Sequence, residues 1–215
     1  MTKSKAYPTD LQDNEWQIIV QELPQAQGQG RPRKHSYRAI LNGIFYVLHN
    51  GITWRSMPHD LPPWQTVYHY FRLWRITGVW QALNRKLRQL LGKRLKRHPV
   101  PSAAMLDSQS VKTVEGGQER GVDVHKRCTG RKRHILVDSL GLLLSVYVSA
   151  ASVTDPGAAR VLLSCFFNQF FQSFRLQRIW ADAGYQGTLV TWVQETLGWC
   201  LEMVKRPPQA TGFKQ

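Results

Sequence analysis

The 215-residue sequence lacks long apolar runs and is poor in cysteine. No segment approaches the roughly 20 apolar residues that span a bilayer, and residues 1–5 are not followed by an apolar signal region. Cys128, Cys165 and Cys200 lie far apart without a Cys-x-x-Cys pair, so neither a disulfide framework nor a structural zinc site is indicated. The histidines show no metal-ligand spacing either. We therefore expect a globular, cytoplasmic protein that does not enter a membrane.

Acidic residues are also scarce, with 14 Asp and Glu against 29 Lys and Arg, a net charge of +15. Such an excess usually has a polyanion as its partner, DNA or RNA in the first place and a membrane surface as the weaker alternative. The charge is uneven along the chain: residues 1–98 hold 16 basic and 5 acidic residues, whereas residues 99–215 hold 13 and 9. This asymmetry predicts two units.

The first 98 residues are predicted to be all-helical. Apolar residues recur at helical spacing in four segments, near residues 16–23, 37–50, 67–74 and 80–91. Short helices with tight breaks, such as Asn50-Gly51, are compatible with a helix-turn-helix-like DNA-binding domain. A small helical bundle with a solvated basic face is the alternative that the pattern leaves open.

After Pro99 the pattern changes to short apolar runs rich in β-branched residues, so residues 99–215 are predicted to form a mixed sheet covered by helices. The predicted order is three strands, a helix, a strand, a helix and a final strand. The predicted segments are 103–111, 135–138, 142–148, a helix from 155, 176–181, 188–197 and 200–204. Asp155 is interpreted as the N-cap of the first of these helices, with Pro156 at its first position.

Two acids stand out because each adjoins an apolar strand, where a charge needs a partner or a metal. Asp107 follows Ala104-Met105-Leu106, and Asp182 follows Ile179-Trp180-Ala181. Carboxylates on adjacent strands suit hard cations such as Mg²⁺, although strand-end acids also form turns and caps. Asp138 is better explained as the first residue of a hairpin turn.

Basic residues that we expect to contact DNA phosphates fall near the predicted helices and around the predicted hairpin. They are Arg31, Arg33, Lys34, Lys112, Lys126, Arg127, Arg131, Lys132 and Arg133. The basic residues from Lys126 to Arg133 precede the predicted hairpin, and a solvated loop is the alternative interpretation of this segment.

Long segments of the sequence resemble bacterial insertion-sequence DDE transposases of family five. They are residues 101–113, 130–138 and 180–185 in the second half, and 30–33, 54–60 and 62–68 in the first. The resemblance implies a ribonuclease-H-like catalytic domain with Asp107 and Asp182 as catalytic metal ligands. It further implies Mg²⁺ or Mn²⁺, two ions in the complete enzyme, and double-stranded DNA as partner, both terminal repeats and target. Association of more than one subunit on DNA and a place at the bacterial nucleoid would follow.

The same resemblance implies a third acid, a Glu in a Trp-x-x-Glu-Arg segment after a Lys-Arg-Pro turn. The sequence reaches Lys205-Arg206-Pro207-Pro208 and stops at Gln215, and neither Glu195 nor Glu202 has the matching position. Within these residues we therefore expect no third catalytic Glu, and hence a chain that binds DNA without cutting it. Three functions stay open: an active transposase, a catalytically inactive DNA-binding remnant or regulator of transposition, and, on charge alone, an RNA-binding structural protein.

The basic helical half generates a first prediction. Residues 1–98 expressed alone should bind duplex DNA, with an affinity that falls steeply as salt rises because phosphate-bound counterions are released. Fluorescence anisotropy between about 50 and 200 mM salt measures the slope of log affinity against log salt. An affinity that does not change with salt would contradict an electrostatic interface.

Overall fold

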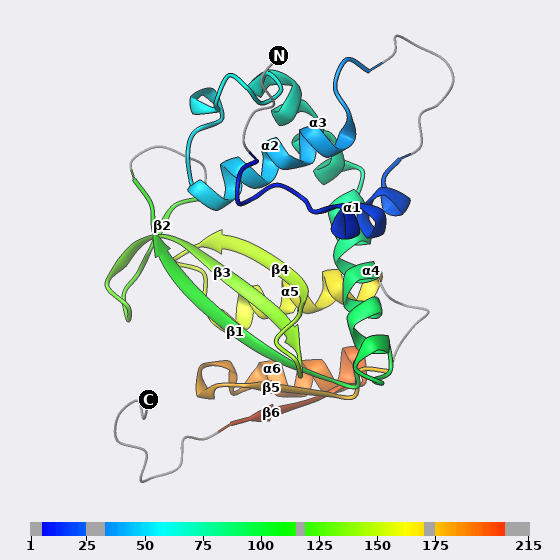
Figure 1. The fold of residues 1–215 in the computed structure, drawn as a ribbon. Coiled ribbons are helices and arrows are strands. Elements are labelled where there is room, and N and C mark those ends of the chain that lie inside the picture. The colour runs from blue at the N-terminus through cyan, green and yellow to red at the C-terminus, as the bar shows by residue number, and fades with distance from the viewer. Residues whose placement is uncertain (1–5, 25–32, 115–118, 170–174, 205–215) are drawn as a thin grey trace, which may run out of the picture. The chain divides into compact units, whose positions relative to one another are not determined.

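The computed structural model describes residues 6–24, 33–114, 119–169 and 175–204 (Figure 1). The chain divides into two compact units, Met1–Leu87 and Arg88–Gln215. The division falls inside a helix, α4 (Val79–Arg94). None of the described helices is both long and apolar enough to cross a membrane. The domain boundary after residue 98 stays a prediction.

The first unit is helical, as expected from its periodicity. Its elements are α1 (Asp13–Ile19), η1 (Val20–Glu22), α2 (Tyr37–Asn50), η2 (Trp54–Ser56), α3 (Trp64–Ile76) and the start of α4. The Ser36 hydroxyl accepts a hydrogen bond from the Ala39 amide and begins α2, which ends before Gly51 as predicted. The helix-turn-helix-like assignment of this unit stays a prediction.

The core of the helical unit forms where α2 and α3 face each other. Ile40, Leu41 and Ile44 of α2 are buried, and so are Val67 and Trp74 of α3. The Trp74 ring also lies within 5.6 Å of the Trp80 ring at the start of α4. Because these apolar residues recur every three or four positions, each helix turns one face inward and leaves its charged face to solvent.

The second unit is built on a six-stranded mixed sheet, which confirms the predicted fold class. The strands are β1 (Ala103–Lys112), β2 (Gly121–Asp123), β3 (Cys128–Asp138), β4 (Leu143–Ala150), β5 (Arg178–Ala181) and β6 (Cys200–Met203). Their order is β2-β3-β1-β5-β6, with β4 also paired to β3. The first four strands are joined by antiparallel pairings, whereas β1, β5 and β6 run parallel. The short β2 and the early start of β3 differ from the expected strand limits.

Helices α5 (Asp155–Gln169) and α6 (Thr188–Trp192), the latter extended by η4 (Val193–Leu197), pack on the core of this unit. That core uses alternate strand residues, among them Leu106 and Ile179. Residues of the opposite parity, such as Met105 and Val146, are exposed. Successive strand residues point to opposite faces, so the core covers one face of the sheet. In Figure 1, α5 lies behind β3 and β4.

Gly130 in β3 generates a prediction about stability. A Cβ atom on Gly130 would lie 2.0 Å from the carbonyl oxygen of Val111 in β1 and 2.9 Å from the amide of Thr113, the residue that follows β1. Gly130→Ala should therefore lower the free energy of unfolding by about 1–3 kcal/mol, or more if the strands cannot separate. Urea unfolding followed by circular dichroism measures the change.

Gly92→Ala is the matched control. The added methyl group would make only ordinary contacts, at 3.6 Å or more, and Gly92 lies within α4. This substitution should leave stability unchanged or raise it by up to about 1 kcal/mol, since alanine favours helix. Equal losses for the two variants would contradict the close approach at Gly130.

Candidate active site

Of the two acids singled out in the sequence, Asp107 lies on β1 and Asp182 directly follows β5, the neighbouring parallel strand. Strand β1 pairs with β5 in a constant register that ends with Met105 opposite Trp180. Asp107 and Asp182 each lie two residues beyond this last pair, so continuing the register would place them at the same level. Asp182 is the first residue after β5, where the chain turns into η3 (Ala183–Tyr185). Adjacent strands are about 4.8 Å apart, which is why both carboxylates leave the sheet at one place.

Each of the two carboxylates is held by a local backbone amide. Asp107 Oδ1 accepts from the Ser108 amide at 2.7 Å, and Asp182 Oδ1 accepts from the Gly184 amide at 3.0 Å. Both side chains are exposed. Within the described part of the chain, the Oδ2 atoms have no hydrogen-bonding partner. Exposed carboxylates with one oxygen anchored and the other available are a donor set that suits Mg²⁺ or Mn²⁺.

The remaining acids considered in the sequence have other surroundings. Glu202 in β6 accepts from Trp180 Nε1 at 2.9 Å and pairs with Arg178 at 3.0 Å. Glu195 is exposed on η4. Within residues 6–24, 33–114, 119–169 and 175–204, no group of three or more His, Cys, Asp or Glu side chains is arranged to hold a metal ion. The Lys205-Arg206-Pro207-Pro208 turn lies outside the described residues.

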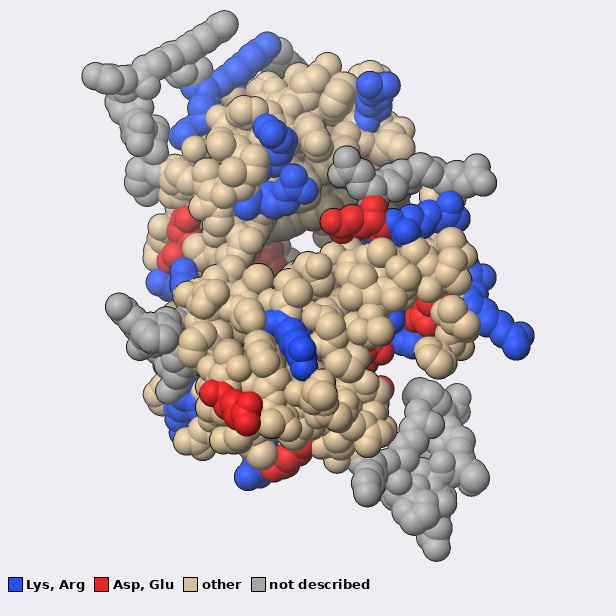
Figure 2. All heavy atoms as spheres, turned by 180° about the vertical axis from the view of Figure 1, so that it is seen from behind, with Lys and Arg blue, Asp and Glu red and all other residues tan. Residues whose placement is uncertain are grey.

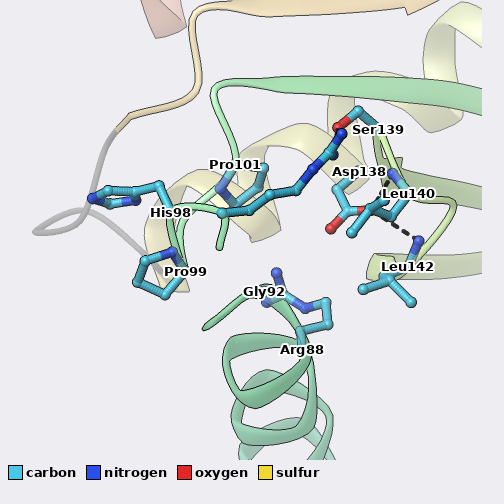
Figure 3. A pocket seen from close by; sticks show the side chains of 10 residues that line it. Arg88, Gly92, His98, Pro99, Pro101, Asp138, Ser139, Leu140 and Leu142 are labelled. Atoms are coloured by element: carbon cyan, nitrogen blue, oxygen red, sulfur yellow. Dashed lines mark hydrogen bonds between the residues drawn. The ribbon is translucent and has the colours of Figure 1, made fainter. Parts of the chain in front are cut away.

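Asp138 forms the turn between β3 and β4, as interpreted from the sequence. Its Oδ1 accepts from the amides of Leu140 and Leu142 at 2.8 and 2.9 Å (Figure 3). The turn lines a cavity of about 40 Å³, together with Arg88 from α4. Arg97 donates to the Ser139 hydroxyl at its rim. Because Asp138 is occupied by this turn, it does not belong to the pair formed by Asp107 and Asp182.

A buried ion-paired cluster lies close to the two acids, and Lys132 is at its centre. Its ammonium group is 3.4 Å from Asp123 Oδ2 and 3.2 Å from Asp155 Oδ1, and it also donates to the Val153 carbonyl. The Lys132 side chain is only 7% exposed. A buried ammonium group with two carboxylate partners is not available to a phosphate, so we leave Lys132 out of the proposed DNA-binding set.

Asp123 ends β2 and is the most enclosed acid of the cluster. The Ser110 hydroxyl donates to it at 2.6 Å, and the Lys126 amide donates at 3.1 Å. The Ser110 hydrogen bond, the Lys126 amide and the Lys132 charge together lower the pKa of Asp123 to about 2, against the opposing effect of burial. The Asp123 carboxylate is therefore charged at every physiological pH.

Tyr185, three residues after Asp182, is buried next to the same cluster. Burial raises the pKa of Tyr185, the charges of Asp155, Asp107 and Asp182 raise it further, and the Ser108 hydroxyl partly lowers it. The three carboxylates thus act on one hydroxyl group. That hydroxyl is neutral and has no hydrogen-bonding partner of good geometry among the described residues.

The other basic residues expected to bind DNA in this unit lie on β1, β3 and the turn between β2 and β3. Lys112, Lys126, Arg127 and Arg133 are exposed, and Arg131 is half-buried. Lys126 Nζ donates to the carbonyl of Ser108, directly after Asp107. Arg133 donates to Gln109, two residues after Asp107 on the same face of the sheet. Figure 2 shows Lys and Arg side chains, with acids between them, at the edge that holds β2 in Figure 1.

In the helical unit, the described candidates lie just before α2. The Arg33 guanidinium group lies 3.8 Å from the centre of the Tyr37 ring, and Lys34 is exposed. Together with His35 they line a broad hollow that also includes Thr66 and Tyr70 of α3. Arg31 lies outside the described residues.

Sequence reasoning missed the residues that surround the two acids. Asp155 was interpreted as a helix cap, but the Thr154 hydroxyl accepts from the Gly157 amide in that position and Asp155 is the first residue of α5. Because Asp155 does not cap the helix, its carboxylate is available to Ser108 and Lys132. Ser108 and Ser110 alternate along the strand after Asp107. This alternation of small polar residues indicates that the core-facing side of the strand becomes polar beyond Leu106.

Known proteins match both units. Residues 11–84 match the family model of a putative transposase of the IS4/5 family, and residues 98–207 match that of the transposase DDE domain. An uncharacterized 16.2 kDa protein of insertion element IS402 from Burkholderia cepacia is 32% identical over 122 residues, 52% of this chain and 78% of that protein. The structure of Mos1 transposase in a paired-end complex with the left transposon end matches with 15% identity and a TM-score of 0.31. That match covers 82% of this chain but only 61% of the Mos1 chain.

The buried cluster generates a prediction about pH. Lys132→Met leaves Asp123 buried without its ammonium partner and should lower the free energy of unfolding by about 3–5 kcal/mol at pH 7. The folded pKa of Asp123, about 2, lies below its ordinary value of 3.8. Its stabilising effect is therefore complete above about pH 4 and is lost as pH falls toward about 2. Urea unfolding at pH 7 and pH 3 should show a smaller difference between wild type and variant at the lower pH.

Lys126→Met is the control, because Lys126 belongs to the same hairpin and its side chain is exposed. Its effect on stability should stay within about 0.5 kcal/mol at both values of pH. If Lys132→Met were as mild as this control, the cluster would contribute little to the fold.

Proposed function

Because the chain belongs to the transposases with a DDE domain, we propose that it acts on the ends of an insertion element, binding them and catalysing metal-dependent cleavage and strand transfer of DNA. One observation carries the catalytic part: Asp107 and Asp182 each lie two residues beyond the last pair of the parallel strands β1 and β5, and each has an oxygen free of hydrogen bonds within the described residues. If the two acids served only as caps or turn residues, they would not need to lie at the same height on neighbouring strands.

Asp107 and Asp182 would hold the divalent cation, Mg²⁺ or Mn²⁺, through their Oδ2 atoms. Such ions, two in the complete enzyme, polarise phosphoryl oxygens and make bound water more acidic. The protein's own part is orientation. The amides of Ser108 and Gly184 fix one oxygen of each acid and so limit the rotation of the carboxylates. A ligand that is already oriented loses less entropy when the ion binds.

The basic side chains near Asp107 would guide the DNA backbone to the acids. Lys126 and Arg133 contact β1 directly after Asp107, so a phosphate between them would lie next to the carboxylates. Lys112, Arg127 and Arg131 would extend this surface along the sheet. Residues 1–98, with Arg31, Arg33 and Lys34, would bind the duplex at the element ends, and residues 99–215 would contain the ribonuclease-H-like catalytic core. Two ends held together imply more than one subunit on the DNA.

A second candidate is a DNA-binding remnant or regulator of transposition without cutting activity. It is favoured by the finding that the described residues contain no three-acid group able to hold a metal ion. With two carboxylates, −2 formally opposes the +4 of two divalent ions, and the second ion would be held weakly. The two candidates share DNA binding and differ in cleavage.

Asp107→Asn and Asp182→Asn, each made in the full chain, test the proposed metal pair. Each substitution removes a ligand charge, so each should weaken Mn²⁺ binding roughly tenfold or more, as measured by the electron paramagnetic resonance signal of free Mn²⁺. Asp138→Asn, which changes the acid of the β3–β4 turn, should bind Mn²⁺ like the wild type. Binding that survives both substitutions would rule out the metal pair.

The same proteins decide between the two candidates in an assay with DNA that carries the element's own ends. Mn²⁺-dependent nicking that disappears with Asp107→Asn indicates an active transposase. Metal and DNA binding without nicking indicates a regulator or remnant.

A further inference from the structure

Asp155 connects the two segments that carry the candidate metal ligands. Its Oδ1 accepts a hydrogen bond of 2.9 Å from the hydroxyl of Ser108, the residue that follows Asp107. Its Oδ2 lies 3.9 Å from the point where a Cβ atom on Gly184 would stand, and Asp182 Oδ1 lies 3.0 Å from that same point. One carboxylate therefore contacts β1 directly after the first acid and faces the turn that begins at the second.

The capping of α5 does not explain this arrangement. Thr154 holds the cap position through the Gly157 amide, so the helix begins without help from the Asp155 side chain. A carboxylate in the first turn of a helix interacts favourably with the helix dipole, but this interaction does not require contacts with particular side chains. Here the side chain is 25% exposed and is directed to Ser108 and Lys132.

Lys132 fixes the Asp155 carboxylate in place. The ammonium group lies between Asp155 Oδ1 and Asp123 Oδ2, and it also donates to the Val153 carbonyl, two residues before Asp155. Asp123 is in turn held by the Ser110 hydroxyl and the Lys126 amide. A side chain with so many short contacts has few alternative positions, which is what orientation of a neighbouring group requires.

Ser108 passes this constraint on to Asp107. Its hydroxyl donates to Asp155 on the core side of the sheet, while its amide donates to Asp107 Oδ1. On the other side, the Gly184 amide donates to Asp182 Oδ1, and the Gly184 position is close to both Asp182 and Asp155. The buried Tyr185 hydroxyl, next to these groups, adds a polar atom that lacks a well-placed partner.

We propose that Asp155 is a positioning residue: held by Lys132, it sets the arrangement of Asp107 and Asp182 through Ser108 and the turn at Gly184. It is not a metal ligand. The inference rests on the proposed function of the acid pair. A merely structural buried ion pair would stabilise the unit without affecting how the pair binds a cation.

The test measures Mn²⁺ binding to the purified full chain, by electron paramagnetic resonance, at a temperature where circular dichroism shows every variant folded. Asp155→Ala removes the acceptor for Ser108 and should weaken Mn²⁺ binding roughly 10- to 100-fold, the usual effect of losing a group that orients a metal ligand. Asp155→Asn retains an acceptor oxygen and should keep most of the affinity. A merely structural charge would predict the same loss for both variants.

Ser108→Ala should reproduce most of the loss, and combining it with Asp155→Ala should add little, because both act through one hydrogen bond. If Asp155→Ala does not fold, Ser108→Ala decides the question alone. Asp138→Ala, which removes a buried acid from the β3–β4 turn, controls for general destabilisation and should bind Mn²⁺ like the wild type.

Two results would overturn the inference, and they differ from failure of the proposed function. Wild-type binding in both Asp155→Ala and Ser108→Ala, while Asp107→Asn abolishes binding, leaves the acid pair intact and removes the role of Asp155. If Asp155→Ala and Asp138→Ala weaken Mn²⁺ binding equally, the role of Asp155 is only structural. Unchanged binding in Asp107→Asn and Asp182→Asn overturns the acid pair itself, and the inference with it.

Discussion

The site depends above all on the hydrogen-bonded position of β1 between β3 and β5. The antiparallel ladder with β3 runs from Ala104 to Lys112, and the parallel ladder with β5 holds residues 103–105 on the other side. Strand β1 cannot slide past one neighbour without breaking its bonds to both. This double pairing fixes the level of Asp107, and the parallel register gives Asp182 the same level from a segment 75 positions later in the chain.

Charge burial gives the sheet a second constraint at the same end. Lys132, Asp123 and Asp155 come from β3, β2 and α5; Lys132 and Asp123 are buried and Asp155 is 25% exposed, so each buried charge needs its partner. Each charge therefore depends on elements far away in the sequence. Their convergence ties β2 and β3 to α5, the helix that packs on the core, and in the proposed role of Asp155 the same contacts would also orient the acid pair.

Local patterns predicted much of this arrangement. Three features depend only on residues close together in the sequence, so they could be predicted from it. They are the apolar runs before Asp107 and Asp182, the turn at Asp138, and the helical periodicity around Ile40 and Leu41. The segment Cys128–His134 did not look like a strand, because its Gly, Lys and Arg residues are typical of a solvated loop. Its membership in β3 comes from partners on β1 and β4. The burial of Lys132 likewise depends on acids 9 and 23 positions away, which no local pattern reveals.

The crowding at Gly184 restricts which substitutions position 184 can accept. A methyl group there would stand 3.0 Å from a carboxylate oxygen of Asp182, at the surface and away from the apolar core. Such a methyl group would not touch the apolar core, so the domain would still fold. If selection maintains the acid pair, glycine at position 184 should be lost only in copies of the element that no longer transpose.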